Sequence, residues 1–296
     1  MSVNTYTPGS SKPLVIYHSN CADGFSAAWC FWDSYKHGVE YYPGVYQKEP
    51  PDVTGRTVYL VDFSYKLAIV EKMLEAANGV ILIDHHKTAI EDLLPLKDHP
   101  KFRMYTDLER SGAMLAWDYL MENVPEFLRR DKPLLLGHIE DRDLWRFKLP
   151  NTREIQANVF SYEYTFENWD RLMSAGQKEL LEMTVAGAAI ERKHHKDIKE
   201  LIDVCKRFMV IGGFTVPTAS LPYTLTSDAG HLLAKEYLDG EAFAACYWDT
   251  RESRIFSLRS CDNGMDVSEI AKQYGGGGHK HAAGFKVPRN HELAIC

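Results

Sequence analysis

The stretch GVILIDHHKTAIEDL, residues 79–93, carries a strand directly into a cluster of polar side chains. Its apolar run, residues 79–83, has the composition of a strand that is buried on both faces of a sheet. The run stops at Asp84, His85 and His86. Because packing on both sides fixes such a strand, it delivers an acid and two imidazoles to one defined point.

The residues around this stretch alternate between strand and helix patterns. Further strands are expected at PLVIYHS (13–19) and TVYLVDFS (57–64). Helices are expected around residues 25–32, at KLAIVEKMLEAAN (66–78) and at SGAMLAWDYLMENV (111–124). This alternation predicts an α/β fold, in which helices cover both faces of a parallel sheet.

The chain is expected to have three parts. Residues 1–150 form the α/β catalytic domain, and residues 151–207 form a charged helical linker. Residues 208–296 form a smaller α/β domain with a mixed sheet. The patterns that predict this last domain are strands at RFMVIGGF, AFAACYWD and RIFSLRS and helices at DAGHLLAKEYL and DVSEIAKQY.

Composition narrows the class of protein. The 296 residues are 45% hydrophobic and carry a net charge of −7, which disfavours binding to long double-stranded DNA through a basic surface. The six cysteines contain no CxxC pair, as expected of a reduced chain without a zinc ribbon. The N-terminus lacks a signal-peptide core, and no apolar run reaches membrane-spanning length. We therefore expect a soluble cytoplasmic protein, monomeric or homodimeric.

Polar side chains gather at the carboxyl ends of the predicted strands, where ligands of parallel sheets bind. Carboxylates and imidazoles together suit Mn²⁺, Mg²⁺ or Co²⁺ better than a thiolate zinc site. Two such ions roughly 3.5–4 Å apart, bridged by a carboxylate, activate water against phosphorus. Asp62 is the bridge candidate. Taken singly, each residue would more often be structural; together they predict a metal site: His18, Asp23, Asp62, Asp84, His85, His86 and Asp141.

A second candidate site lies near the C-terminus, in the glycine run Gly275–Gly278 followed by His279. Glycines let backbone N–H groups approach an anion closely. Arg259, at the end of a predicted strand, would add a guanidinium fork. A flexible linker is the alternative for the glycines, and a surface ion pair is the alternative for Arg259.

These elements together resemble the DHH phosphoesterase superfamily with its associated C-terminal domain. Asp84-His85-His86 matches the motif that names the family. In chain order, four more stretches resemble family motifs: HSNCADGF (18–25), YLVDFS (59–64), GHIEDRDLW (137–145) and GGGGHKHAAGF (275–285). The resemblance spans nearly the whole chain.

The resemblance implies roles for individual residues. His18 and Asp23 would ligate one of two Mn²⁺-type ions, Asp62 would bridge the two ions, and His85 and Asp141 would complete the ligand set of the second ion. Asp84 would orient its neighbours, and His86 would face the substrate. The substrate would be held by the remaining family positions: Arg259, Gly276, Gly277, Gly278 and His279.

Two positions leave alternatives open. The common first motif reads His-x-x-x-Asp-x-Asp, but here Cys21 replaces the first aspartate and His18 lies one residue closer to it. Cys21 would either ligate a soft metal or lie at the site without being required. Arg110 and Ser111, in a further family-like stretch, would either bind an anion at a helix N-terminus or simply cap that helix.

The function expected is that of a divalent-metal-dependent phosphodiesterase, similar to an oligoribonuclease. A metal-bound hydroxide would attack the phosphorus of a short oligonucleotide or small nucleotide. A phosphomonoesterase acting on 3′-phosphoadenosine 5′-phosphate and a pyrophosphatase are the enzymatic alternatives. A non-catalytic nucleotide or RNA sensor is the third hypothesis. Loss of the bridging acid or of the DHH residues would favour it, but all of these residues are present.

Overall fold

The computed structural model describes residues 6–125, 130–237, 240 and 242–295. The chain folds into two compact units, Met1–Glu191 and Arg192–Cys296. Each unit has its own sheet and its own hydrophobic core. The functional division at residues 150 and 207 stays a prediction.

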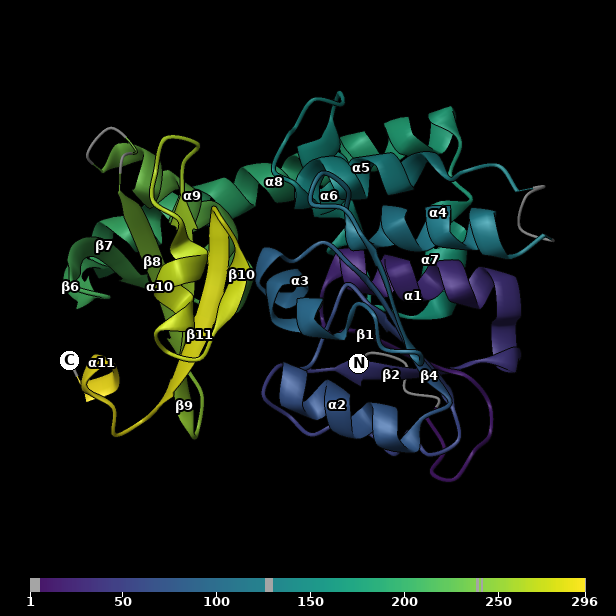
Figure 1. Ribbon diagram of the computed structural model, residues 1–296. Coiled ribbons are helices and arrows are strands. Elements are labelled where there is room, and N and C mark those ends of the chain that lie inside the picture. Colours follow the sequence, from purple (N-terminus) through teal and green to yellow (C-terminus); the bar gives the residue numbers. More distant parts are fainter. Residues whose placement is uncertain (1–5, 126–129, 238–239, 241, 296) are drawn as a thin grey trace. The chain divides into compact units, whose positions relative to one another are not determined.

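The first unit is built on a five-stranded parallel sheet of order β2-β1-β3-β4-β5 (Figure 1). The three strands predicted from apolar runs are confirmed as β1, β3 and β4, and they occupy the centre. The edge strands β2 and β5 were not predicted; Pro43 lies within β2, a residue that sheets tolerate at their edges. The bounds are β1 Leu14–His18, β2 Glu40–Gly44, β3 Thr57–Val61, β4 Gly79–Asp84 and β5 Phe102–Thr106.

The register of this sheet brings the functional side chains to one edge. Val61 of β3 lies opposite Tyr17 of β1 and Ile83 of β4. The residue that follows each of these is polar, and the three leave the sheet side by side. They are His18, Asp62 and Asp84.

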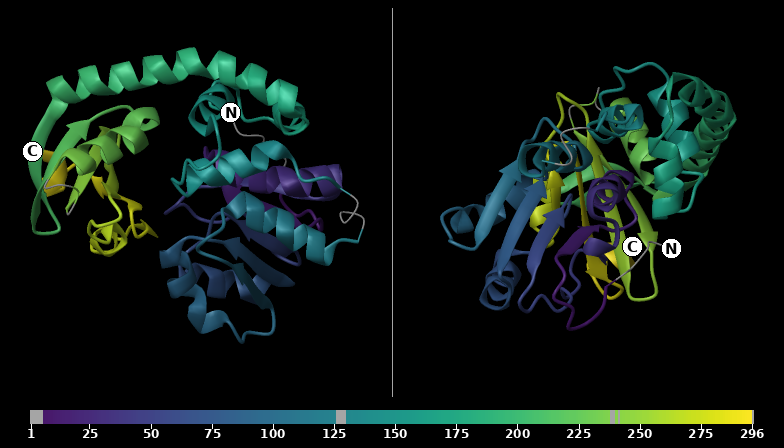
Figure 2. Two further views of the ribbon diagram at one scale, coloured as in Figure 1. Left: turned by 90° about the horizontal axis from the view of Figure 1, so that it is seen from above. Right: turned by 90° about the vertical axis from the view of Figure 1, so that its right-hand side faces the viewer.

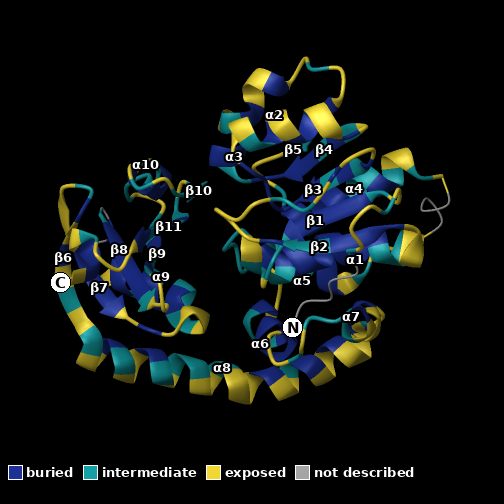
Figure 3. Ribbon diagram, turned by 90° about the horizontal axis from the view of Figure 1, so that it is seen from below, coloured by how far each residue is buried: buried dark blue, intermediate teal, exposed yellow. Residues whose placement is uncertain are grey.

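Helices cover both faces of the sheet (Figure 3). In β1, Val15 and Tyr17 pack into one core, whereas Leu14 and Ile16 pack into the other, as the two-residue period of a strand requires. The first core includes α1 (Ala22–Tyr35), α4 (Gly112–Asn123), α5 (Leu134–Asp143), α6 (Thr152–Val159) and α7 (Phe166–Met173); the second includes α2 (Leu67–Ala76) and α3 (Lys87–Leu93). The predicted α/β fold is confirmed.

The second unit has a six-stranded mixed sheet of order β10-β11-β9-β8-β7-β6. β7 and β8 pair in parallel, and the other neighbours pair antiparallel. The bounds are β6 Lys206–Ile211, β7 Phe214–Ser220, β8 Phe243–Asp249, β9 Ser253–Ser260, β10 Gly277–His279 and β11 Ala282–Pro288. The mixed sheet predicted for this part is confirmed.

Both faces of the second sheet are also covered. One core contains α10 (Val267–Lys272) and α11 (Glu292–Ile295). The other contains α9 (Thr226–Glu236) together with Ile198 and Ile202 of α8. Sheet and helices therefore bury two apolar layers, as in the first unit.

The long charged segment is one helix, α8 (Gln177–Cys205), which begins in the first unit and ends in the second (Figure 2). The helix expected in the linker region is thus confirmed. Through the described parts of the chain, the helices are too short or too polar to cross a bilayer.

A buried ion pair offers a test of this fold. Arg56 is 1% exposed, and it donates to Glu40 Oε2 at 2.8 Å and to the carbonyl of Lys12 at 2.8 Å. Because Arg56→Ala leaves Glu40 without its cation, we expect the free energy of unfolding to fall by about 3–5 kcal/mol. Urea denaturation followed by circular dichroism measures the loss.

The matched control for Arg56 is Lys178→Ala, which removes an exposed pair with Glu182 in α8. Exposed pairs contribute little to stability, so the urea midpoint of this variant should stay near that of the wild type. Equal losses in the two variants would contradict the importance of the Arg56–Glu40 pair.

Candidate metal centre

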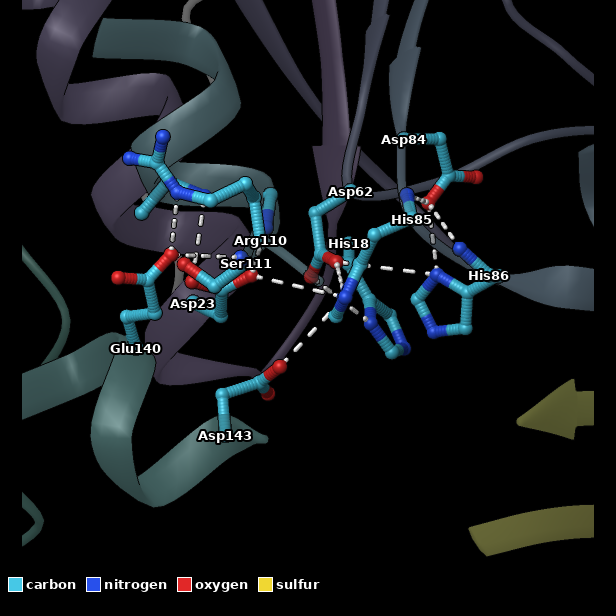
Figure 4. Close-up of polar contacts among 12 residues, drawn as sticks. His18, Asp23, Asp62, Asp84, His85, His86, Arg110, Ser111, Glu140 and Asp143 are labelled. Atoms are coloured by element: carbon cyan, nitrogen blue, oxygen red, sulfur yellow. Dashed lines mark hydrogen bonds and ion pairs between the residues drawn. The ribbon is translucent and has the colours of Figure 1, made fainter. Parts of the chain in front are cut away.

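Asp62 is the central residue of the polar edge. It follows β3 in the left-handed conformation, with φ of 52°, and it is 1% exposed. This conformation is uncommon for residues other than glycine, and Asp is one of the few that tolerate it. The turn aims the carboxylate back at the ends of β1 and β4 (Figure 4).

Two imidazoles approach the two oxygens of Asp62 separately. His85 Nε2 lies 3.2 Å from Oδ1, and His18 Nδ1 lies 3.4 Å from Oδ2. Burial by itself would raise the pKa of Asp62, but His18 and His85 hold this pKa well below its ordinary range. Asp62 therefore stays charged and links the two histidines.

His85 is surrounded by acids. Besides Asp62, its Nε2 lies 3.5 Å from Asp143 Oδ2 and 3.8 Å from Asp23 Oδ2. Burial alone would lower the pKa of His85, but these carboxylates raise it to about 10. Burial and the mutual repulsion of the acids raise the pKa of Asp23 well above its ordinary value and also raise that of Asp143. The cluster has more negative charge than one imidazolium balances.

The N-terminus of α4 holds Asp23. The backbone N–H groups of Gly112 and Ala113 donate to its carboxylate at 2.6 and 3.1 Å. Ser111 is the N-cap of this helix and accepts from the N–H of Met114 at 3.3 Å. The anion at this helix N-terminus is thus a side chain of the protein itself, placed by the dipole and the unpaired N–H groups.

Two glycines make room for Asp62. A Cβ atom at Gly112 would lie 2.5 Å from Asp62 Cβ, and one at Gly24 would lie 3.0 Å from Asp62 Oδ2. Neither glycine was singled out in the sequence, although Gly24 follows Asp23 directly. α1 and α4 can approach the Asp62 carboxylate this closely because Gly24 in α1 and Gly112 in α4 have no side chain.

Asp84 orients the two histidines that follow it. Its Oδ1 accepts from the backbone N–H groups of His85 and His86, and it lies 2.7 Å from His86 Nδ1. Burial alone would lower the pKa of His86, but Asp84 raises it. The Nδ1 proton of His86 is therefore held toward Asp84.

Cys21 lies at the same edge. One potential ligand atom from each of His18, Cys21 and Asp62 falls within 4.8 Å of the others. Burial and the nearby carboxylates raise the pKa of the Cys21 thiol well above its ordinary value. Without a bound cation, Cys21 is thus a neutral thiol, and its role as a ligand stays a prediction.

Asp141 and Asp143 lie on different sides of α5. The carboxylate of Asp141 accepts from the N–H groups of Lys148 and Leu149 and from the Thr152 hydroxyl, at 2.8, 3.1 and 2.7 Å. The structure therefore directs Asp141 into the following loop and brings Asp143 to the cluster. The ligand role expected for Asp141 is not what this geometry favours. Asp143, which sequence reasoning missed, was detectable as the second aspartate of EDRD (140–143).

Arg110 lies next to the cluster, held by two acids. It is 2.7 Å from Glu140 Oε1 and 2.7 Å from Asp118 Oδ2, and it lines a cavity of about 350 Å³ at the end of β5. Ser111 is fully buried, so its observed contact is the helix cap. Substrate binding by Arg110 and Ser111 stays a prediction.

In the second unit, the predicted anion-binding residues lie on neighbouring strands. His279 of β10 pairs with Ala282 of β11, which pairs with Arg259 of β9. Directly paired residues of antiparallel strands point to the same face, so Arg259 and His279 flank a small alanine on one face. Arg259 also donates to the Ser227 hydroxyl at 3.3 Å.

The glycine run leads from a turn at Gly275 into β10, which includes Gly277 and Gly278. A Cβ atom at Gly276 would lie 2.1 Å from the carbonyl oxygen of Gly284, and one at Gly278 would lie 2.5 Å from that of Ala282. Gly278 also has φ of 141°. These glycines are required for close approach of β10 and β11, and anion binding by Gly276, Gly277 and Gly278 stays a prediction.

The cluster fits divalent cations. Asp62 belongs to two groups of potential ligands, one with Asp23 and His85 and the other with His18 and Cys21. Two buried atoms, His18 Nδ1 and Asp62 Oδ2, face each other at 3.4 Å, a contact that is not a hydrogen bond by its geometry, and neither atom makes a hydrogen bond elsewhere within the described residues. A cation would satisfy both atoms and offset the repulsion among the acids.

Known proteins resemble the chain over most of its length. No protein-family model matches it. An uncharacterised protein of Acanthamoeba polyphaga mimivirus is 29% identical over 295 residues, which cover 92% of this chain and 66% of that protein. Oligoribonuclease NrnB of Bacillus subtilis (strain 168) is 25% identical over 241 residues, which cover 74% of this chain and 55% of that protein. The chain thus spans about two thirds of the first and about half of the second.

A solved structure shares the fold. The DHH domain of a member of the s1p family of ribosomal proteins superposes with a TM-score of 0.58 at 15% identity, covering 96% of this chain and 85% of that one. Its likeness concerns the arrangement of strands and helices. The chain therefore has the fold of a DHH domain, and its ordered motifs and the His–Asp cluster at the sheet edge resemble those of the DHH phosphoesterase superfamily with its associated C-terminal domain.

Proposed function

We propose that this protein is a divalent-metal-dependent phosphodiesterase that hydrolyses short oligonucleotides or small nucleotides. The observation that carries the proposal is the shared position of Asp62, between one group of ligands at His85 and another at His18. The similarity to a protein named an oligoribonuclease supports the class of substrate. Mn²⁺ is the ion we propose, with Mg²⁺ and Co²⁺ as alternatives.

We assign the ligands as follows. His18, Asp23, Asp62, His85 and Asp143 would hold the ions, with Asp62 shared between two groups of ligands and Cys21 beside them. When bound, divalent ions would supply Lewis acidity that activates water and would neutralise charge on the phosphate oxygens. Asp23 is positioned by the N-terminus of α4, and His85 by the backbone contact to Asp84.

His86 is proposed to face the phosphate. Its Nδ1 is held by Asp84, and this carboxylate raises the pKa of the ring, which favours its protonated form. A protonated imidazole can neutralise a phosphate oxygen or donate a proton to the leaving oxygen. Arg259 and His279 are proposed to bind a second anionic group of the substrate.

The first prediction concerns the bridge. Asp62→Asn removes the charge that both groups of ligands share, so hydrolysis should fall below detection while the fold is kept. The assay follows a dinucleotide, a five-nucleotide RNA, a 3′,5′-bisphosphate nucleotide and pyrophosphate with added Mn²⁺. Asp92→Asn is the control, because Asp92 accepts from the N–H of Leu67, away from the cluster. Wild-type turnover by Asp62→Asn would exclude the proposed centre.

The choice of substrates also separates the alternatives. Release of mononucleotides from the dinucleotide or the RNA supports a phosphodiesterase. Turnover of only the bisphosphate supports a phosphomonoesterase, and turnover of only pyrophosphate supports a pyrophosphatase.

A second prediction distinguishes Asp143 from Asp141. Loss of residues that merely support a ligand weakens metal binding by about 10–100-fold, so Asp143→Asn should weaken Mn²⁺ binding by at least about tenfold. Asp141→Asn should lower the melting temperature, because Asp141 holds the loop after α5. The same variant should bind Mn²⁺ with an affinity close to that of the wild type. Calorimetric titration and thermal denaturation of both variants test this, and the reverse pattern would assign Asp141 to the metal.

A third prediction follows from the pKa of His85, which is raised to about 10 in the cluster without a cation. Below that pH the ring is protonated, and His85 must give up this proton before Nε2 can ligate an ion. Metal affinity should therefore rise with pH between about 7 and 10, by up to about tenfold per unit for one proton.

Calorimetry in two buffers of different ionisation enthalpy measures the protons released as Mn²⁺ binds at pH 7. The release should be smaller in His85→Ala, for which His138→Ala is the control because His138 bonds to Thr152 instead. Identical heats in both buffers for the wild type would refute the proton–metal exchange.

A further inference from the structure

A loop between α5 and α6 interleaves cations with aromatic rings. Trp145, Arg146, Phe147 and Lys148 follow one another directly after the end of α5, in a chain whose net charge is −7. Alternating basic and aromatic side chains are typical of surfaces that bind single-stranded nucleic acid. The chain-wide composition does not reveal this feature because it is confined to one loop.

The rings and guanidinium groups of this region are stacked. Arg142 Cζ lies 4.3 Å from the centroid of the Trp145 ring, and Arg153 Cζ lies 3.6 Å from that of Phe147. The two rings meet edge to face with their centroids 5.0 Å apart. All four residues are half-buried, so the stack reaches the surface. We call Arg142, Trp145, Phe147 and Arg153 the aromatic platform.

The backbone of the platform is held in a conformation that its residues disfavour. Trp145 and Phe147 have φ of 56° and 47°, in the left-handed region that bulky residues rarely adopt. The carbonyl oxygen of Asp141 accepts from the N–H groups of Arg146 and Phe147, at 2.8 and 3.3 Å. With the contacts of the Asp141 carboxylate described above, this residue fixes the loop. Strain maintained in this way is often found at ligand-binding sites.

The platform is continuous in the chain with the metal centre. Asp143, 3.5 Å from His85 Nε2, lies between Arg142 and Trp145. Arg146 also donates to the carbonyl of Glu109 at 2.7 Å, which joins the loop to the segment that precedes α4. The residues of the platform therefore begin directly beside Asp143 in the chain.

We propose that the aromatic platform binds one nucleobase, and the phosphate beside it, of a single-stranded oligonucleotide whose neighbouring phosphate lies at the metal centre. This proposal rests on the proposed function and deepens it, because it assigns the substrate class to particular residues. Rings and guanidinium planes stack on any base, so the subsite favours oligonucleotides over pyrophosphate without a strong sequence preference.

Binding without hydrolysis tests the platform. Fluorescence anisotropy of a labelled five-nucleotide RNA is measured with Ca²⁺ in place of Mn²⁺, under conditions in which the RNA stays intact, with the wild type, Trp145→Ala and Trp145→Tyr, and with abasic RNA of equal length. Loss of a stacked base costs about 5- to 100-fold in affinity, so Trp145→Ala should bind the RNA that much more weakly. Trp145→Tyr should recover most of the affinity, and the abasic RNA should bind the wild type and Trp145→Ala equally.

Leu149→Ala is the matched control, because Leu149 is 41% exposed in the same loop but outside the stack; it should bind RNA as the wild type does. The Mn²⁺ affinity of Trp145→Ala shows whether the substitution merely disrupts the loop. A collapsed loop would displace Asp143 and so weaken Mn²⁺ binding. Weaker RNA binding with unchanged Mn²⁺ affinity supports the platform. Equal RNA affinity of the wild type and Trp145→Ala, equal losses on both RNAs, or no RNA binding by the wild type would overturn it.

The two proposals fail in different ways. If the wild type binds RNA through Trp145 but hydrolyses none of the phosphodiesters with Mn²⁺, the proposed function fails and the platform stands. If the wild type hydrolyses the dinucleotide while Trp145→Ala leaves its KM unchanged, the platform fails and the proposed function stands.

Discussion

The contact between Asp62 and its two imidazoles is the interaction on which the site depends. Buried carboxylates are costly unless cations or hydrogen-bond donors compensate them. Asp62 is compensated on one oxygen by His85 and on the other by His18. Asp23 and Asp143 are not compensated to the same degree, as the raised pKa of each carboxyl indicates. The fold thus concentrates negative charge at one point, which is the electrostatic condition for binding divalent ions.

The sheet and α4 supply the rigidity that such a charge cluster needs. Parallel register places His18, Asp62 and Asp84 at consecutive strand ends, and apolar layers on both faces hold the strands. α4 contributes N–H groups to Asp23 and a glycine that lets the helix approach Asp62. Like charges stay close because the surrounding backbone cannot relax, so the cost of repulsion is recovered only when a cation binds.

Much of this was predictable from the sequence, for a physical reason. Central strands of a parallel sheet are apolar on both faces, so β1, β3 and β4 are visible as short runs that end in His18, Asp62 and Asp84. β2 and β5 lie at the edges, where burial is weaker, and their patterns are correspondingly weak. The helix that carries Asp141 and Asp143 shows a different limit. Residues two apart on a helix point in nearly opposite directions, and only the packing of α5 decides which acid meets the cluster.

The aromatic platform is not evident from the composition of the chain. Net charge is a property of the whole chain, and −7 disfavours an extended basic groove for long strands. It does not bear on one segment of a dozen residues, 142–153, which contains the loop between α5 and α6. Four basic residues, at 142, 146, 148 and 153, follow or flank an acid of the cluster. Their charge is opposite to that of the metal-free centre, whose acids attract a cation and not a phosphate. A cation-loaded centre takes the reacting phosphate, and the loop takes the neighbouring base and phosphate. The basic residues of this segment are confined to positions 142–153. A basic segment this short suits a substrate of a few nucleotides better than a long nucleic acid.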